Sequence, residues 1–270
     1  MELKEIRRIS FEKGIGINYI SKENKISELL TKLYLIFKDK IILKGGTALN
    51  RAFLENKGRF SEDIDLDFIN KDLKQAINYI EEKMKLIENF KIEKSRLMNQ
   101  TLRFDCYYIN EINQKDKIQV EFYLGHDKII GNANTIAIKS NLLYNQTNII
   151  KTYDIESLIA RKIVALLNRE EGKDLYDLFY SLKEKYDKEK VKKILIKMCK
   201  YYSINFNSIN KLLNEKFESI FKNIKYIGNS TNHYLTKENS IGWKIIAQET
   251  KENLIKVFEK KLTKGKIYKR

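Results

Sequence analysis

Proline is absent from this sequence of 270 residues, while cysteine, histidine and tryptophan occur only two, two and one times. The two cysteines, Cys106 and Cys199, are too few for a disulfide scaffold and have no metal-ligand spacing. Eleven glycines exclude a collagen-like repeat. No apolar run approaches the roughly 18 residues that a membrane-spanning helix needs, and the charged N-terminus lacks the apolar stretch of a secretory signal. The sequence therefore predicts a protein of the reducing cytoplasm with no membrane partner.

Positive charge is abundant. Lys and Arg number 52 against 36 Asp and Glu, a formal net charge of +16, and 43% hydrophobic residues suffice for a core. Such an excess favours a polyanionic partner, nucleic acid ahead of an anionic membrane. Candidate contacts are Lys192, Lys193, Lys197 and a basic tail over residues 260–270, for which a solvated surface is the alternative. A Lys-rich composition that follows an AT-rich genome explains the charge equally well.

Apolar periodicity divides the chain into a mixed first half and a helical second half. The first half has the pattern of helices at 26–37, 47–54 and 73–84, and of strands at 41–43, 63–68, 101–109 and 117–124. After residue 151, apolar stripes predict helices around 155–166, 175–182 and 191–198, with helical character continuing to 258. We therefore expect an α/β (α+β) fold, with an α/β core and its N-terminal helices over residues 1–150 and a helical domain over 151–270.

A glycine pair and an acidic pair stand close together in the first half. Gly45-Gly46-Thr47 follows a predicted strand and opens a predicted helix, whose free backbone N–H groups and hydroxyl suit a phosphate. Asp63 and Asp65 project from the same face of the next strand. Adjacent carboxylates repel each other, and Mg²⁺ or Mn²⁺ would relieve that conflict. Each feature alone is more often a simple turn or a solvated strand face, but together they indicate a polyphosphate site beside a metal.

Further charged residues accompany this pair. Glu121 lies among apolar neighbours on a strand, either as a third metal ligand or as an ordinary carboxylate at a sheet edge. Lys162 and Arg169 are two helical turns apart and so share a helix face. Asp174 and Asp177 share a face of the next helix. For these four residues the competing interpretation is a salt-bridged pair of helices.

The segments KGGTAL (44–49), RFSEDIDL (59–66) and KDLYDL (173–178), with Arg161-Lys162 between the last two, resemble the AbiEii/AbiGii/MenT toxins. These are nucleotidyltransferase-like toxins of bacterial toxin–antitoxin and abortive phage-infection systems. The resemblance covers roughly residues 41–182. It implies a minimal polymerase-β-like nucleotidyltransferase core with a helical C-terminal half, and metal-dependent use of a nucleoside triphosphate (NTP). In MenT-like members it implies addition of nucleotides to the 3′ acceptor end of tRNA, which blocks translation. A cognate antitoxin encoded nearby is also implied, and it need not touch the toxin.

The resemblance assigns roles to individual residues. The implied catalytic residues are Asp63, Asp65, Glu121, Lys162 and Asp174, and the implied metal ligands among them are Asp63, Asp65 and Glu121. The implied nucleotide-binding residues are Lys44, Gly45, Gly46, Thr47, Arg169 and Asp177. Asp67, one pleat further along the strand, is expected at the rim and outside the site.

Other functions remain compatible with the same residues. A nucleotidyltransferase core does not encode its acceptor, so the nucleotide could be transferred to a protein side chain instead of tRNA. The chain could also act as a toxin that binds an NTP or RNA without any transfer. A basic RNA-binding module with an incidental acidic strand belongs to a different class, and alanine at Asp65 would separate it from an enzyme.

Overall fold

The computed structural model describes residues 1–258 apart from 71, 94, 126–128 and 144–145. The helices are α1 Leu3–Lys13, α2 Ile17–Phe37, α3 Gly45–Ala52, α4 Leu73–Met84, α5 Ile155–Asn168, α6 Gly172–Ser181, α7 Lys188–Tyr201, α8 Ile209–Lys222, α9 Ile224–Asn229 and α10 Trp243–Phe258. The strands are β1 Ile41–Lys44, β2 Ile64–Phe68, β3 Lys91–Ile92, β4 Arg96–Met98, β5 Thr101–Ile109, β6 Lys115–Tyr123, β7 Ala133–Lys139 and β8 Thr147–Tyr153. The predicted mixed α/β fold with a helical C-terminal half is confirmed.

All the strands belong to one mixed sheet with the order β3-β5-β6-β2-β1-β8-β7, to which β4 adds by pairing with β5. Strand β2 is antiparallel to β1 and parallel to β6, while β1 is parallel to β8. The four strands expected from the sequence are present, but the short strands β3 and β4 and the longer strands β7 and β8 were not expected. Strand β8 lies between β1 and the edge strand β7, and the expected domain boundary between residues 150 and 151 falls within it.

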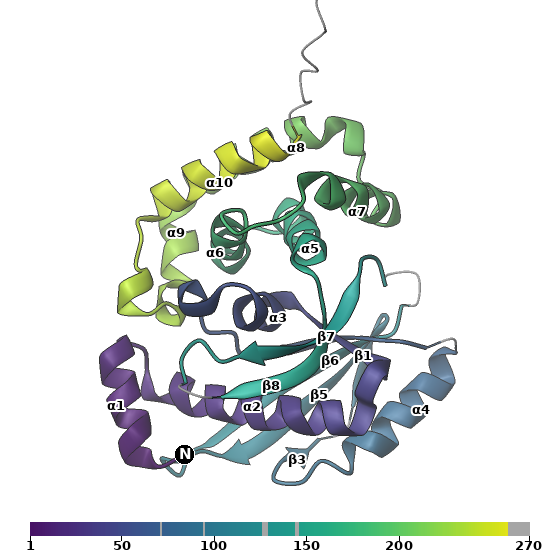
Figure 1. The fold of residues 1–270 in the computed structure, drawn as a ribbon, viewed down its shortest axis with the longest axis vertical. Helices are drawn as coiled ribbons and strands as arrows, with labels where there is room; N and C mark the ends of the chain where they lie inside the picture. Colours follow the sequence, from purple (N-terminus) through teal and green to yellow (C-terminus); the bar gives the residue numbers. More distant parts are fainter. Residues whose placement is uncertain (71, 94, 126–128, 144–145, 259–270) are drawn as a thin grey trace, which may run out of the picture.

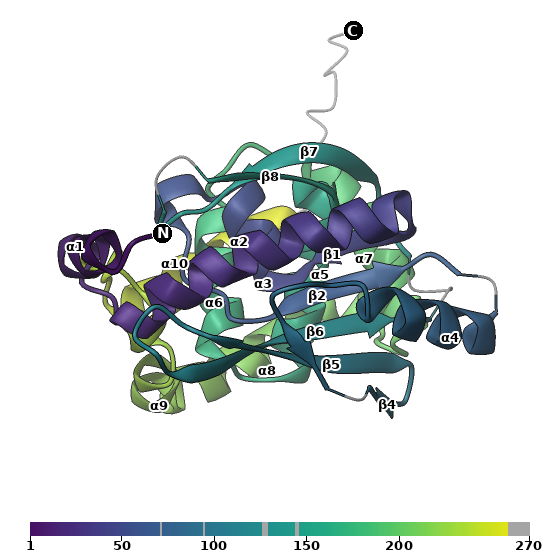
Figure 2. The same ribbon diagram turned by 90° about the horizontal axis from the view of Figure 1, so that it is seen from below.

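Helices α2 and α4 cover one face of the sheet, and α3 with the C-terminal helices covers the other (Figures 1 and 2). The first interface is apolar and aromatic because alternate residues of the strands are large hydrophobics. The ring of Phe37 at the end of α2 lies 6.3 Å from that of Phe68 and 5.2 Å from that of Phe122. The alternation that buries Ile64, Leu66 and Phe68 leaves the acidic positions between them to face the opposite side.

The helical half begins with α5, which Asp154 caps by accepting a hydrogen bond from the backbone N–H of Ser157 at 2.9 Å. Helices α6 and α7 pack on α5, and α8 and α10 close the far side (Figure 1). The predicted basic tail over residues 260–270 lies outside the described residues. Within the described part of the chain, none of the helices has the length and apolar composition that would let it cross a membrane.

Candidate active site

Four charged residues form a row across four neighbouring strands. Lys44 of β1 is paired with Asp65 of β2, Asp65 with Glu121 of β6, and Glu121 with Arg103 of β5. Directly paired residues of adjacent strands point to the same face, which here is the face turned toward the helical half. The guanidinium of Arg103 and the side-chain amide of Gln119 both donate to Glu121, the amide at 2.8 Å. Two carboxylates therefore lie side by side in the middle of the row.

The glycine pair gives the backbone close access to these carboxylates. Gly45 has φ +73°, a left-handed conformation that L side chains rarely adopt, and it begins α3 directly after β1. A Cβ at Gly45 would lie 2.2 Å from Oδ2 of Asp65. A Cβ at Gly46 would lie 2.5 Å from Nη2 of Arg59 and 2.9 Å from Oγ of Ser61. A side chain at position 45 would be strained by its φ, and one at position 46 would force Arg59 and Ser61 to move. The first turn of α3 thus offers its backbone N–H groups between an acidic and a basic side chain.

A ladder of alternating charges stands opposite the carboxylates. The ammonium of Lys162 on α5 lies 2.8 Å from Asp174 and 2.7 Å from Asp177, both on α6. Arg59, in the segment before β2, donates hydrogen bonds to the carboxylate of Asp177 from Nε at 2.9 Å and from Nη2 at 2.8 Å. Arg169, just after α5, donates from Nε to Asp174 at 2.7 Å. Of these five residues, Arg169 is half-exposed and the other four are buried.

Burial disfavours the charged forms of the side chains in this ladder, but their oppositely charged partners outweigh that effect. Burial raises the pKa of Asp174 and Asp177, but Lys162, Arg169 and Arg59 hold both pKa values below the usual range. Burial lowers the pKa of Lys162, but the two carboxylates raise it overall. The ladder is therefore fully ionised at neutral pH, and it fixes the lysine ammonium in place.

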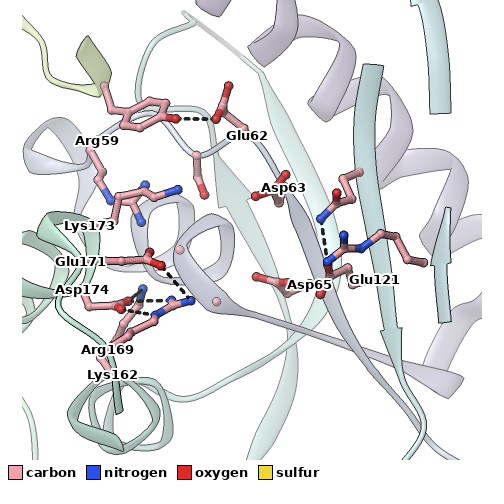
Figure 3. A pocket seen from close by; sticks show the side chains of 16 residues that line it. Arg59, Glu62, Asp63, Asp65, Glu121, Lys162, Arg169, Glu171, Lys173 and Asp174 are labelled. Carbon is pink, nitrogen blue, oxygen red and sulfur yellow. Dashed lines mark hydrogen bonds and ion pairs between the residues drawn. The ribbon is translucent and has the colours of Figure 1, made fainter. Parts of the chain in front are cut away.

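The carboxylate row and the charge ladder form two walls of one cleft of about 380 Å³ (Figure 3). Asp63, Asp65 and Glu121 lie on the strand side, while Arg59, Lys173, Lys162 and Arg169 lie on the helix side. The glycine pair lies between the two walls. An elongated polyanion with a bound cation would meet negative side chains along one edge and positive side chains along the other.

The carboxylates of the acidic wall are buried and repel one another, and a bound cation would relieve this repulsion. The pKa of Asp65 is raised from 3.8 to about 6, mainly by burial and also by the charges of Glu121 and Asp63, although Lys44 and Lys162 oppose the shift. Burial and Glu62 likewise raise the pKa of Asp63. Carboxylate oxygens are the ligands that Mg²⁺ and Mn²⁺ prefer. The donor chemistry therefore fits a divalent cation, although no three Asp, Glu, His or Cys side chains of the described residues converge closely enough to enclose one.

Most residues predicted for the site lie along this cleft. Of the predicted residues, those that line the cleft are Gly45, Gly46, Asp63, Asp65, Glu121, Lys162, Arg169 and Asp174. Three others do not line it. Thr47 is buried and donates its hydroxyl to the backbone carbonyl of Asp63 at 2.5 Å. Asp177 lies behind Lys162, and Lys44 lines a neighbouring hollow.

The expectation that Asp67 lies at the rim is wrong. Its side chain is 1% exposed because the β8–α5 segment covers this end of β2. Its carboxylate accepts hydrogen bonds from Lys44 at 2.5 Å, from the hydroxyl of Tyr153 at 2.6 Å and from Arg161 at 3.2 Å. Strand β8, which was not expected, supplies Tyr153. Asp67 is therefore a buried carboxylate that holds Lys44, Tyr153 and Arg161 together, and it does not lie at the edge of the site.

Several residues that line the cleft were not expected there from the sequence. Arg59 belongs to the RFSEDIDL segment, and its positive charge among acidic neighbours is the feature of the sequence that could have identified it as a site residue. Arg103 is paired with Glu121 only through the strand register, which a single sequence does not fix. Tyr234, whose hydroxyl donates to Glu62 at 2.6 Å, comes from 172 residues further along the chain, and nothing local marks it.

Comparisons with known proteins agree with this geometry. Residues 29–244 match the family model described as the nucleotidyl transferase AbiEii toxin of type IV toxin–antitoxin systems. Among solved structures, MenT4, a nucleotidyltransferase toxin from Mycobacterium tuberculosis, superposes with a TM-score of 0.66 at 13% identity, over 97% of this chain and 91% of that one. JHP933 from Helicobacter pylori gives 0.55 at 18% identity, over 90% and 93%.

At these identities the solved structures show a shared fold, whereas the family model matches most of the chain. A search of curated protein sequences gives no match. Family, fold and cleft agree on one class of enzyme, in which a nucleotide is transferred from an NTP. The chain belongs to the AbiEii family of nucleotidyltransferase toxins of type IV toxin–antitoxin systems.

Proposed function

We propose that this toxin transfers a nucleoside monophosphate from an NTP to the 3′ acceptor end of tRNA and so blocks translation. The observation that carries the proposal is the cleft with two oppositely charged walls and the backbone of Gly45-Gly46 between them. The net charge of +16 supports a polyanionic acceptor such as tRNA. Family membership implies an antitoxin, and we expect its gene nearby.

The acidic wall would hold the divalent cations of the reaction. Asp63, Asp65 and Glu121 are the residues that would bind Mg²⁺ or Mn²⁺. When bound, such a cation activates the attacking hydroxyl and neutralises charge on the leaving oxygen. Glu121 is engaged by Arg103 and Gln119, so it would exchange part of this pairing for the cation. The protein therefore keeps its third carboxylate positioned between a cation site and a guanidinium.

The basic wall would bind the triphosphate. Lys162 has three N–H donors, and two carboxylates at 2.8 and 2.7 Å engage its ammonium, which leaves donor capacity for a phosphate oxygen in the cleft. Lys173 and Arg169 add charge from the same side, and the N–H groups at the start of α3 add dipoles. These fixed donors would stabilise the charge that develops on the phosphates during transfer.

The reaction forms one bond and breaks one. The terminal 3′ hydroxyl oxygen of the acceptor attacks the α-phosphorus, and the bond from that phosphorus to the oxygen bridging to the β-phosphate breaks. Pyrophosphate leaves, and the hydroxyl proton passes to solvent. The nucleoside monophosphate remains on the tRNA, whose lengthened end can no longer be aminoacylated normally.

The test is label transfer with purified protein, total tRNA, Mg²⁺ and each NTP in turn. We expect label from [α-³²P]NTP to appear in tRNA and label from [γ-³²P]NTP to appear only in pyrophosphate. The Asp63→Ala/Asp65→Ala double variant should lose transfer, and Asp39→Ala, an exposed carboxylate before β1, should retain it. Both preparations should unfold cooperatively and be fully folded at the assay temperature before rates are compared.

The other outcomes separate the alternatives. Label on protein in place of tRNA would retain the transferase and change the acceptor. NTP binding without label in any acceptor would favour a toxin that binds nucleotide or RNA without transfer. Transfer that survives the double alanine change would contradict the assignment of the acidic wall.

A further inference from the structure

A second hollow of about 330 Å³ adjoins the active-site cleft. The two cavities have five lining residues in common, which are Gly45, Asp65, Lys162, Arg169 and Asp174. The hollow therefore opens onto the place where the acidic and basic walls come together. It lies between the end of β1 and the helices α5 and α7, which pack side by side (Figure 1).

The lining of the hollow differs in character from that of the cleft. Val164 and Ala165 of α5 and Met198 of α7 give it an apolar wall, and the ring of Tyr202, just after α7, borders it. The side chains along the cleft are charged or polar, and its aromatic residue, Tyr234, uses its hydroxyl on Glu62. Tyr202 is 41% exposed, so its ring is accessible to a ligand.

The polar groups of the hollow are held rigidly. Lys44 and Arg161 line it and both bind the buried carboxylate of Asp67, at 2.5 and 3.2 Å. The guanidinium of Arg161 also lies over the ring of Tyr153, 4.0 Å from its centroid, and donates to the carbonyl of Ile130. An apolar wall, an accessible aromatic ring and a few fixed polar groups are the usual elements of a small-molecule pocket.

We infer that this hollow holds the nucleoside of the donor NTP, with its base against Tyr202 and Met198. The inference rests on the proposed function, because it takes the triphosphate to bind along the basic wall. Lys162 and Arg169 belong to both cavities, so a triphosphate on these cations has its nucleoside end within reach of the hollow. Bases stack on aromatic side chains, and methionine adapts to their flat faces.

The acceptor nucleotide is the other candidate occupant, and the lining argues against it. Glu121, Arg103 and Gln119 line the cleft on its strand side but do not line the hollow. In-line displacement requires the attacking and leaving oxygens to lie on opposite sides of the phosphorus. An acceptor that approaches over these strand-side residues would therefore face a pyrophosphate leaving along the basic wall, and the hollow remains for the nucleoside.

The test compares two ligands that share phosphates and differ in the nucleoside. Binding of each NTP and of inorganic tripolyphosphate is measured by calorimetry in Mg²⁺ without any RNA. We expect Tyr202→Ala to weaken the preferred NTP about tenfold, because base–aromatic stacking has that scale, and to leave tripolyphosphate unchanged. Tyr202→Phe keeps the ring and should bind the NTP like wild type. Ala165→Leu, which fills the hollow from α5, should weaken the NTP selectively as well.

Each other result would overturn the inference. Equal NTP affinity in wild type, Tyr202→Ala and Ala165→Leu would mean that the nucleoside lies elsewhere. Equal weakening of NTP and tripolyphosphate would mean that the changes act on the phosphate site or on the fold. A defect confined to the KM for tRNA would assign the hollow to the acceptor. Failure of the proposed function would give a different result. The protein would then bind its preferred NTP selectively but would transfer label to no acceptor.

Discussion

At the scale of single residues, the charge of Asp65, which the proposed function uses to bind a cation, lowers the stability of the fold. Its pKa is raised from 3.8 to about 6, so ionising it disfavours the folded state. The cost is absent well below pH 4, grows between pH 4 and 6, and is constant above pH 6. Removing the charge should therefore stabilise the fold at neutral pH while it removes a ligand from the acidic wall.

We predict that Asp65→Asn raises the free energy of unfolding by about 1–3 kcal/mol at pH 7, since each pKa unit corresponds to about 1.4 kcal/mol. The gain should shrink as pH falls through about 6 toward 4, and nucleotidyl transfer should be lost. Chemical denaturation of wild type and variant at several pH values, without divalent cations, measures the difference. A variant that is less stable than wild type at pH 7 would contradict the strain described for this wall.

Gly45 offers a second residue-scale prediction. Gly45→Ala combines a φ of +73° with a Cβ placed 2.2 Å from Asp65, so we expect a loss of at least about 1–2 kcal/mol and a displaced carboxylate. Gly242→Ala is the matched control, because the nearest atom to its Cβ would be 3.9 Å away. Thermal unfolding and transfer assays on both variants provide the measurement. Similar effects at the two positions would refute the steric argument.

At the scale of elements, the charge ladder joins α5 and α6 to the segment before β2. Arg59→Ala would leave Asp177 without its bidentate partner, and we expect a loss of about 3–5 kcal/mol. Replacing both residues, as in Arg59→Met/Asp177→Leu, should recover only part of the loss, because Lys162 would still lack one of its two carboxylates.

Urea unfolding of these two variants and of Asp177→Leu alone measures the coupling. Lys211→Ala, which removes an exposed pair with Glu215 within α8, serves as the control and should cost less than about 0.5 kcal/mol. Full recovery in the Arg59→Met/Asp177→Leu variant would show that Arg59 and Asp177 act as an isolated pair. Partial recovery would show that they belong to a network that positions Lys162.

How far the sequence predicts the structure also depends on the kind of element. The segments with strict periodicity, such as α4 and β2, were expected close to their observed bounds. Strand β8 was missed because its buried positions include Asn148 and Thr152, which are polar. They are satisfied by partners that no local pattern reveals, since Asn148 binds Arg51 and Thr152 donates to the carbonyl of Leu43.

The site was predictable where a motif carried the chemistry and unpredictable where the tertiary fold supplied it. The glycine pair and the two aspartates were evident from their spacing along the chain. The presence of Lys162 in the site was also expected. Its contact with Asp177, which in turn binds Arg59, arises only from the tertiary packing. Arg103 entered the site through strand register, which is a property of the whole sheet.

At the scale of the whole molecule, the net charge of +16 makes a prediction about the salt dependence of the proposed binding to tRNA. With roughly three to five phosphate contacts, the logarithm of tRNA affinity should fall with the logarithm of salt concentration at a slope of about −3 to −5. Lys193→Ala/Lys197→Ala, two exposed positions on α7, should reduce the magnitude of that slope by about 1–2.

Filter binding of tRNA over a range of NaCl concentrations tests this, with NTP affinity as the control that the double change should leave intact. A slope near zero would mean that the positive excess has no part in RNA binding. An unchanged slope in the double variant would move the contact surface away from α7.

The charge ladder joins residues that are far apart in the sequence, and this has a consequence for the synthesis of the toxin. Arg59 and Asp177 are separated by 118 positions, so the complete charge ladder around Lys162 forms only after most of the chain has been synthesised. A ribosome that stalls before α6 releases a product with its acidic strand and glycine turn but without an ordered phosphate clamp. We expect such truncated chains to lack toxicity, so the cell is exposed to active toxin only after a ribosome has synthesised the chain past α6.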